Sequence, residues 1–196
     1  MTTSAAGTRS VAEAVASISR QGDVVVLSGD LGAGKTTFTQ GFVAALGISD
    51  PVTSPTFAIL QHYQGPSTSG ALVVNHLDVY RLASLDEAEA LGLDELLDGT
   101  AVTLIEWGEG IGALLPVDRV TVTLSLEGPE ASEASTPGDA AGPSEGVAGS
   151  QRHGGPLDRR VIELRLEGQL GAREQALHSA LNSAVSDDVA WEVSPC

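Results

Sequence analysis

A glycine-rich motif limits the folds open to this chain, because Gly29-Asp-Leu-Gly-Ala-Gly-Lys-Thr36 matches the pattern G-x-x-x-x-G-K-[ST]. The apolar run before it, 23–28, is typical of a buried parallel strand, and the residues after it predict a helix over about 35–46. A loop of this type wraps its backbone amides around phosphate oxygens, and the positive end of the helix points to the same place. The motif therefore predicts an α/β fold with a phosphate-binding loop, whereas a plain glycine-rich turn would not require this strand and helix.

The residues of the loop have separate expected roles in holding a nucleotide. Lys35 would reach the β- and γ-phosphates, and the hydroxyl of Thr36 would be a ligand of Mg²⁺. Lys35 is also the only lysine of the chain, and it occupies the position where the motif requires lysine. The residues expected to contact the nucleotide here are Gly32, Ala33, Gly34, Lys35, Thr36 and Thr37.

Such a site needs an acidic group at the end of a neighbouring strand to hold the metal ion, directly or through water. Asp78 and Glu106 each end a short apolar run, which is where ligands bind in open α/β sheets. Either acid alone could be a solvated group at a strand end, but both together predict that at least one serves the metal. With Lys35 they form the expected catalytic set, and with Thr36 the expected Mg²⁺ ligands.

Two neighbours of these acids leave alternatives open. His76 shares the strand face of Asp78, so a structural hydrogen bond and a functional role are both compatible with its position. Trp107 follows Glu106 as either a structural aromatic residue or a nucleotide contact. The stretch 75–78 resembles the N-K-x-D motif of GTPases, but it has His where that motif has Lys, so GTP specificity is disfavoured.

The rest of the chain predicts further strands and helices of the same α/β fold. Thr8 is expected to cap the first helix, and Ser84 with Glu87 forms a capping box for a helix that runs to about Leu97. Further strands are expected over 57–64, 71–78, 101–106, 119–127 and 160–167, and further helices over 8–18 and 173–185.

The expected organisation is one domain with an insertion. Residues 1–127 would form the P-loop core, and residues 157–196 would supply the final strand and C-terminal helix of the same domain. Residues 128–156 are rich in Gly, Ser, Ala, Pro and Glu, so we expect a disordered insertion that buries too little apolar surface to order itself.

The charge of the chain excludes some classes of partner. Its 196 residues include 26 acidic and 10 basic side chains, which gives a net charge of −16. Such a surface repels nucleic-acid backbones and anionic lipid, so no autonomous nucleic-acid or membrane binding is expected. A single cysteine cannot form an internal disulfide, and no apolar run approaches the roughly 20 residues needed to span a bilayer. A cytoplasmic protein is expected.

Four stretches in this order resemble the TsaE (YjeE) family, the bacterial ATPases of tRNA threonylcarbamoyladenosine biosynthesis. They are the loop with its helix start at 29–38, Ser54-Pro-Thr-Phe57, His76-Leu-Asp-Val-Tyr-Arg-Leu82 and Ile105-Glu-Trp107. The likeness covers about residues 8–116. It implies a P-loop NTPase-like three-layer sandwich with a mixed, mostly parallel sheet. It also implies a small ATPase that uses ATP and Mg²⁺ and acts with the partners TsaB and TsaD, which install the threonylcarbamoyl group on adenosine beside the anticodon.

The resemblance also implies roles for single residues. Thr36 and Glu106 would be the Mg²⁺ ligands, and Asp78 an essential acid of the site. Thr56 would lie on a switch-like loop near the γ-phosphate, while Trp107 would lie near the nucleotide. Thr8 matches a residue near the base. Members commonly have proline where this chain has Gly108, and the 128–156 insertion is longer than their usual connection.

Two other functions compete with an ATPase that drives or resets a multiprotein assembly. A small-molecule kinase on the same fold commonly uses several Arg and Lys residues, but Lys35 and Arg81 are the only such residues between Gln21 and Asp118. A binding module without turnover would not need both strand-end acids.

Arg81 is the only arginine between Gln21 and Asp118, the half of the chain that forms the site, so positive groups to stabilise the charge that develops during hydrolysis are scarce. We therefore expect slow hydrolysis by the chain alone, stimulated by partners that hold the tRNA.

Overall fold

The apolar runs of the sequence assemble into one six-stranded sheet with the order β2-β3-β4-β1-β5-β6. The computed structural model describes residues 4–54, 60–65, 72–82, 85–127 and 159–184. The strands are β1 (Val24–Gly29), β2 (Leu60–Gln64), β3 (Val73–Asp78), β4 (Val102–Glu106), β5 (Val120–Glu127) and β6 (Arg159–Leu166). The helices are α1 (Ala5–Ile18), α2 (Lys35–Ala45), α3 (Leu85–Ala90), α4 (Leu93–Leu96) and α5 (Glu174–Ala184), with 3₁₀ segments η1 (Gly108–Leu114) and η2 (Gly168–Arg173).

The four inner strands run parallel, and the two edge strands run antiparallel to their neighbours. Strand β1 pairs with β4 and β5, and β3 pairs with β4. The edge strand β2 pairs with β3, and β6 pairs with β5 along its whole length. This topology confirms the predicted mixed, mostly parallel sheet, and it brings the carboxyl ends of β1, β3 and β4 to one edge.

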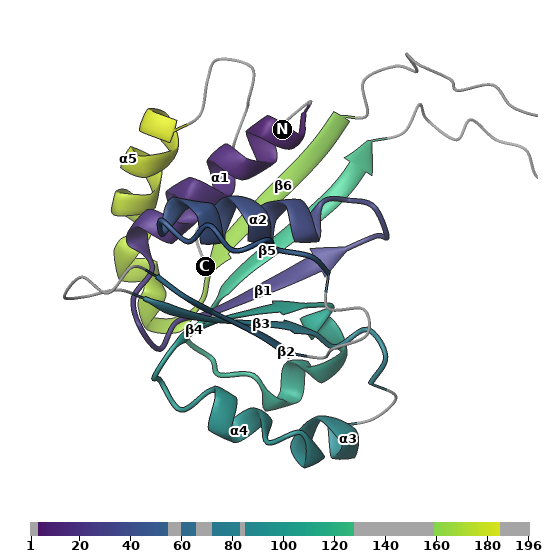
Figure 1. The fold of residues 1–196 in the computed structure, drawn as a ribbon. Coiled ribbons are helices and arrows are strands. Elements are labelled where there is room, and N and C mark those ends of the chain that lie inside the picture. Colours follow the sequence, from purple (N-terminus) through teal and green to yellow (C-terminus); the bar gives the residue numbers. More distant parts are fainter. Residues whose placement is uncertain (1–3, 55–59, 66–71, 83–84, 128–158, 185–196) are drawn as a thin grey trace, which may run out of the picture.

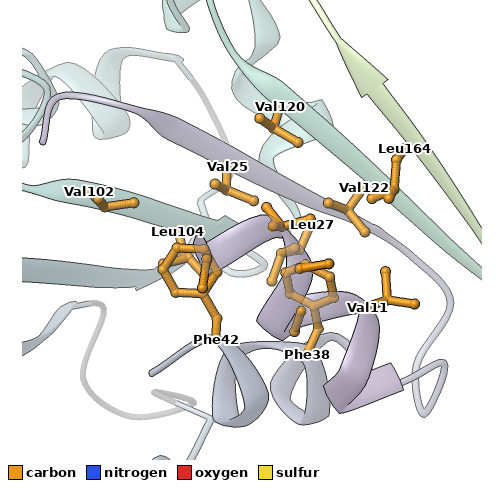
Figure 2. Packing of buried hydrophobic residues seen from close by; sticks show 14 of the residues in the cluster. Val11, Val25, Leu27, Phe38, Phe42, Val102, Leu104, Val120, Val122 and Leu164 are labelled. Atoms are coloured by element: carbon orange, nitrogen blue, oxygen red, sulfur yellow. The ribbon is translucent and has the colours of Figure 1, made fainter. Parts of the chain in front are cut away.

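Helices cover both faces of the sheet, as the three-layer prediction requires (Figure 1). Helices α1, α2 and α5 lie on one face, where Phe38 and Phe42 of α2 are fully buried with Leu27 of β1 (Figure 2). Helices α3 and α4 and segment η1 cover the other face, where Val26 and Ile105 are buried. Because β1 is buried on both faces, its residues are apolar without alternation.

Two local predictions were wrong. Thr8 does not cap the first helix: α1 begins earlier, at Ala5, and the hydroxyl of Ser4 accepts the hydrogen bond from the Gly7 amide at 3.1 Å. The helix expected to end near Leu97 is two short helices, because Gly92 adopts a left-handed backbone with φ of 69° between α3 and α4.

Several predictions fall on residues outside the described part of the chain. These are the insertion over 128–156, the Ser84 side of the capping box, and Thr56. Among the described residues, no helix is both long and apolar enough to cross a membrane.

Candidate functional site

The glycine-rich motif forms a tight loop at the carboxyl end of β1. Gly29 has φ of 127°, and a Cβ atom there would lie 1.9 Å from the carbonyl oxygen of Leu124 in β5. Only glycine fits this close approach of two backbones. Gly34 is the N-cap of α2, with φ of 113° and no side chain to cap the helix. The loop therefore presents the start of α2 to a ligand, as an anion site requires.

Lys35 lies across this loop with its ammonium group held by backbone oxygens. Its Nζ donates to the carbonyl of Gly29 at 2.5 Å and to that of Asp30 at 2.9 Å. Burial lowers the pKa of Lys35 from its ordinary value of 10.5, and nearby acids, Glu106 foremost, oppose that shift. The ammonium group thus lies inside the loop, with loop carbonyls as its partners in this structure.

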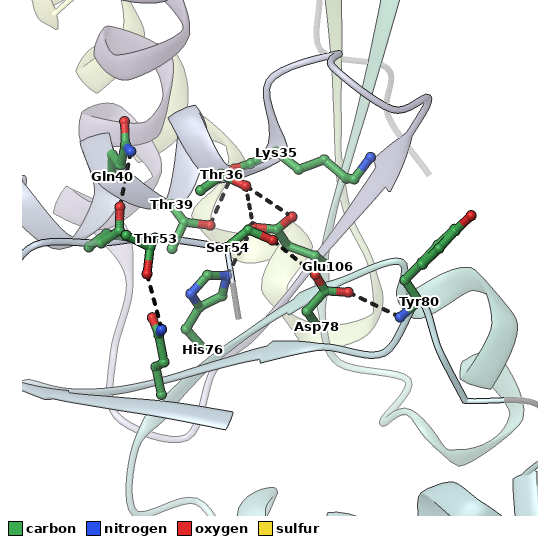
Figure 3. Close-up of polar contacts among 12 residues, drawn as sticks. Lys35, Thr36, Thr39, Gln40, Thr53, Ser54, His76, Asp78, Tyr80 and Glu106 are labelled. Atoms are coloured by element: carbon green, nitrogen blue, oxygen red, sulfur yellow. Dashed lines mark hydrogen bonds and ion pairs between the residues drawn. The ribbon is translucent and has the colours of Figure 1, made fainter. Parts of the chain in front are cut away.

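The hydroxyl of Thr36 and the carboxylate of Glu106 lie side by side behind the lysine (Figure 3). Thr36 Oγ1 donates to both Glu106 oxygens, at 3.1 and 3.3 Å, and Glu106 is only 2% exposed. These are hard oxygen donors of the kind that Mg²⁺ prefers. No group of three or more His, Cys, Asp or Glu side chains among the described residues could hold a metal ion. A magnesium ion here would thus take its other ligands from phosphate and water, which is its usual coordination.

His76 lies directly behind Glu106 and is fully buried. Its Nε2 is 3.0 Å from Glu106 Oε1, the oxygen that also accepts a hydrogen bond from Thr36 at 3.1 Å. His76 therefore makes the hydrogen bond that one of the two alternatives requires, and its partner is a predicted site residue.

Asp78 is the neighbour of Glu106 in the sheet register, yet it has different partners. Its Oδ2 accepts a hydrogen bond from Ser54 Oγ at 3.1 Å, and its Oδ1 accepts one from the Tyr80 amide at 3.1 Å. Asp78 therefore joins the chain at Ser54 to the turn after β3. Ser54 was not among the predicted site residues, although it begins one of the four motifs.

The ring of Trp107 packs against the ammonium group of Lys35. The Lys35 Nζ lies 3.4 Å from the centre of its ring, and the ring of Tyr80 packs on the indole at 4.8 Å between centroids. Trp107 adopts φ of 65°, an uncommon conformation for a bulky residue and one found at functional sites. The indole is thus part of the site. Tyr80 was missed by the sequence analysis, although it lies within one of the four motifs.

Most of the predicted site residues line one cavity of about 400 Å³. Its lining consists of Leu31, Gly32, Gly34, Lys35, Thr36, Thr37, Ser54, Asp78, Tyr80, Glu106 and Trp107. Two predicted residues that the structure describes are not in that lining, and Thr56 lies outside the described residues. Ala33, within the loop itself, is fully buried. Thr8 is also buried, with its methyl group 3.8 Å from the point where a Cβ atom of Gly34 would lie.

The comparisons with known proteins agree with this geometry. The family model described as "Threonylcarbamoyl adenosine biosynthesis protein TsaE" matches residues 2–134. The chain belongs to the TsaE family. Proteins of this family take part in tRNA threonylcarbamoyladenosine biosynthesis.

Similar TsaE proteins occur in distant bacteria. The TsaE protein of Bacillus subtilis is 44% identical over 126 residues, which is 64% of this chain and 76% of that protein. That of Treponema pallidum is 46% identical over 106 residues, or 54% and 75% of the two chains. The crystal structure of Bacillus subtilis YdiB aligns with a TM-score of 0.53 and 39% identity, and covers 64% of this chain and 74% of that one.

Proposed function

We propose that this chain binds ATP with Mg²⁺ and hydrolyses it as a component of tRNA threonylcarbamoyladenosine biosynthesis. The observation that carries the proposal is the contact of Thr36 with the buried carboxylate of Glu106, inside the cavity that Lys35 enters. That trio supplies a metal site and a cation at the place where the loop would hold a polyphosphate.

Each residue has a proposed task in the reaction. The loop amides and the start of α2 bind the phosphates, and Lys35 exchanges the carbonyls of Gly29 and Asp30 for phosphate oxygens. Thr36 and Glu106 hold Mg²⁺, which neutralises the charge that develops on the phosphates. His76 keeps the carboxylate of Glu106 turned toward Thr36.

Hydrolysis by the isolated chain should be slow. Arg81 follows Tyr80 in the exposed turn after β3, outside the cavity lining, so it does not supply a cation to the phosphates from that position. An arginine finger is worth about 10³ to 10⁵ in rate, so a site without one needs help from outside. We propose that TsaB and TsaD homologues give this help by binding near Ser54, whose hydroxyl already reaches Asp78.

The net charge of −16 fits a division of labour in which the partners hold the tRNA and this chain supplies the ATPase. We propose that the chain alone binds neither nucleic acid nor membranes, and that it acts in the cytoplasm.

The decisive experiment is steady-state phosphate release at saturating ATP and Mg²⁺, with purified TsaB and TsaD homologues titrated in. We expect a slow basal rate and a marked rise as the complex forms. Transfer of the phosphate to an added small molecule, with no rise on adding the partners, would refute the proposal and favour a kinase. Binding of ATP without any turnover under all conditions would instead favour a simple binding module.

A further inference from the structure

Arg160, on β6, is partly buried, and two of its three guanidinium nitrogens have no hydrogen-bond partner. Its Nε and Nη1 atoms are both inaccessible to solvent, and neither makes a hydrogen bond. Among the described residues, only the Nδ1 atom of His76 shares this condition. No acidic side chain in the described part of the chain forms an ion pair with Arg160 either. Buried polar atoms without a hydrogen-bond partner destabilise a protein unless something pairs with them.

The unpaired group lies against the phosphate-binding loop. Nη1 of Arg160 is 3.9 Å from the point where a Cβ atom of Gly34 would lie, and side chains of Thr8 and Leu124 approach the same point. Strand β6 begins at the end of the molecule where α1 begins and where the loop enters α2 (Figure 1). A residue far along the chain is thereby brought to the last glycine of the motif.

Arg160 approaches the loop from a different side than the groups that line the cavity. Lys35, Thr36 and Glu106 all face that cavity, whereas Arg160 is not part of its lining. In a loop of this type the lysine serves the β- and γ-phosphates, while the loop backbone surrounds the α- and β-phosphates. A cation beside the backbone of Gly34, away from the lysine, is therefore placed for the end of the phosphate chain that carries the nucleoside.

We propose that Arg160 binds the α-phosphate of the nucleotide and thereby gains the partner it lacks in the free protein. The inference rests on the proposed nucleotide binding by the loop. It goes beyond family membership, because the family model matches residues 2–134 and does not reach Arg160. A guanidinium suits this task, since its planar fork of donors matches phosphate oxygens.

The test compares Arg160→Met, which keeps much of the apolar stem, with Arg165→Met on the same strand. Arg165 is 61% exposed and lies 3.9 Å from Glu163, so its loss changes the net charge equally without touching the loop. Affinities for ATP, ADP and inorganic tripolyphosphate are measured by calorimetry in the full chain. We expect Arg160→Met to weaken all three by about 10- to 100-fold, and Arg165→Met to leave them unchanged.

Each other result overturns the inference. Loss of affinity for ATP but not ADP would place the contact at the γ-phosphate. Loss for both nucleotides but not for tripolyphosphate would place it at the base or ribose. Unchanged affinities would remove any role in binding. If the wild-type chain binds none of the three ligands, the proposed function itself fails, which is a separate outcome.

Thermal unfolding without nucleotide separates binding from a structural role. Because Arg160→Met removes two buried nitrogen atoms that have no partner, we expect the melting temperature of the ligand-free protein to stay the same or rise, while the shift caused by ADP shrinks. A structural role predicts the reverse, a fall of about 3 °C or more in the ligand-free protein. Arg160→Lys, which keeps the charge, provides the same measurements if the methionine variant does not fold, and should retain part of the affinity.

Discussion

The two sides of the phosphate-binding loop differ in how far their polar groups are satisfied. On the cavity side, Lys35 has two carbonyl partners, and Thr36, Glu106 and His76 form a continuous chain of contacts. On the other side, the guanidinium of Arg160 has buried nitrogens with no partner. The cavity side is thus assembled before a ligand arrives, whereas the far side has a charge that a ligand would balance. A bound nucleotide should therefore act on the two sides in opposite ways, because it replaces contacts on the cavity side and creates them on the side of Arg160.

The largest expected effect comes from removing the cation of the cavity side. Lys35→Ala should lower ATP hydrolysis by at least about 10²- to 10³-fold, because no other lysine exists to neutralise the β- and γ-phosphates. Single-turnover phosphate release measures this effect, and Arg9→Ala, on the outer surface of α1, serves as the charge-matched control. Wild-type hydrolysis rates in Lys35→Ala would contradict this prediction, because the cavity side of the loop would then not be where ATP is hydrolysed.

The next effect separates the two acids of the cavity side. Glu106→Gln should lower the Mg²⁺-dependent affinity for ATP by about 100-fold and leave the affinity in EDTA unchanged, because the carboxylate beside Thr36 is the proposed metal ligand. Asp78→Asn should lower turnover with a smaller change, about 10-fold, in Mg²⁺ dependence, because its oxygens already accept bonds from Ser54 and Tyr80.

Titrations of ATP binding at a series of Mg²⁺ concentrations measure how the affinity of Glu106→Gln and of Asp78→Asn depends on Mg²⁺. Equal losses of Mg²⁺ dependence would make Asp78 a metal ligand of the same rank as Glu106. Normal turnover in both variants would show that the acids that hold the metal lie elsewhere.

The smallest effect concerns protons. Burial lowers the pKa of Lys35 below 10.5 in the free protein, and bound phosphates would raise it again by their negative charge. In the window between the lowered pKa and 10.5, part of the lysine is neutral before binding and gains a proton on binding. Nucleotide binding should therefore take up a fraction of a proton there, and affinity should fall as pH rises through that window.

Calorimetry in two alkaline buffers of different ionisation enthalpy measures this uptake. Lys35→Arg is the control, because arginine stays charged in that window and should take up no proton. Proton release on binding by the wild-type chain would contradict the assignment of the lysine as a phosphate ligand.

The residues on the cavity side could be predicted from the sequence because they belong to short local motifs. These motifs are the glycines and lysine of the loop and the acids that end apolar runs, such as the one before Glu106. Parallel pairing of β3 with β4 is enough to bring those ends together. Arg160 could not be placed in this way, because its position depends on the register of β6 against β5, where it faces Leu126.

The local errors have equally physical causes. Thr8 has the chemistry of a helix cap, but α1 extends one turn further toward the N-terminus and buries it, with Ser4 as the cap. The break at Gly92 follows from a left-handed backbone, which is cheap for glycine and invisible to a search for apolar periodicity. The contact of Trp107 with Lys35 depends on a left-handed tryptophan, which no propensity predicts.

That contact gives the molecule an optical readout of its own. Indole emission responds to a cation against the ring, and the ammonium of Lys35 lies 3.4 Å from the ring centre of Trp107. If the ammonium group moves from the ring to a bound phosphate, the indole no longer has a cation against it, and its emission should change. The chain has one other tryptophan, Trp191, which a Trp191→Phe variant would silence. In that variant a single side chain would report, in real time and without a label, how fast the loop fills and empties.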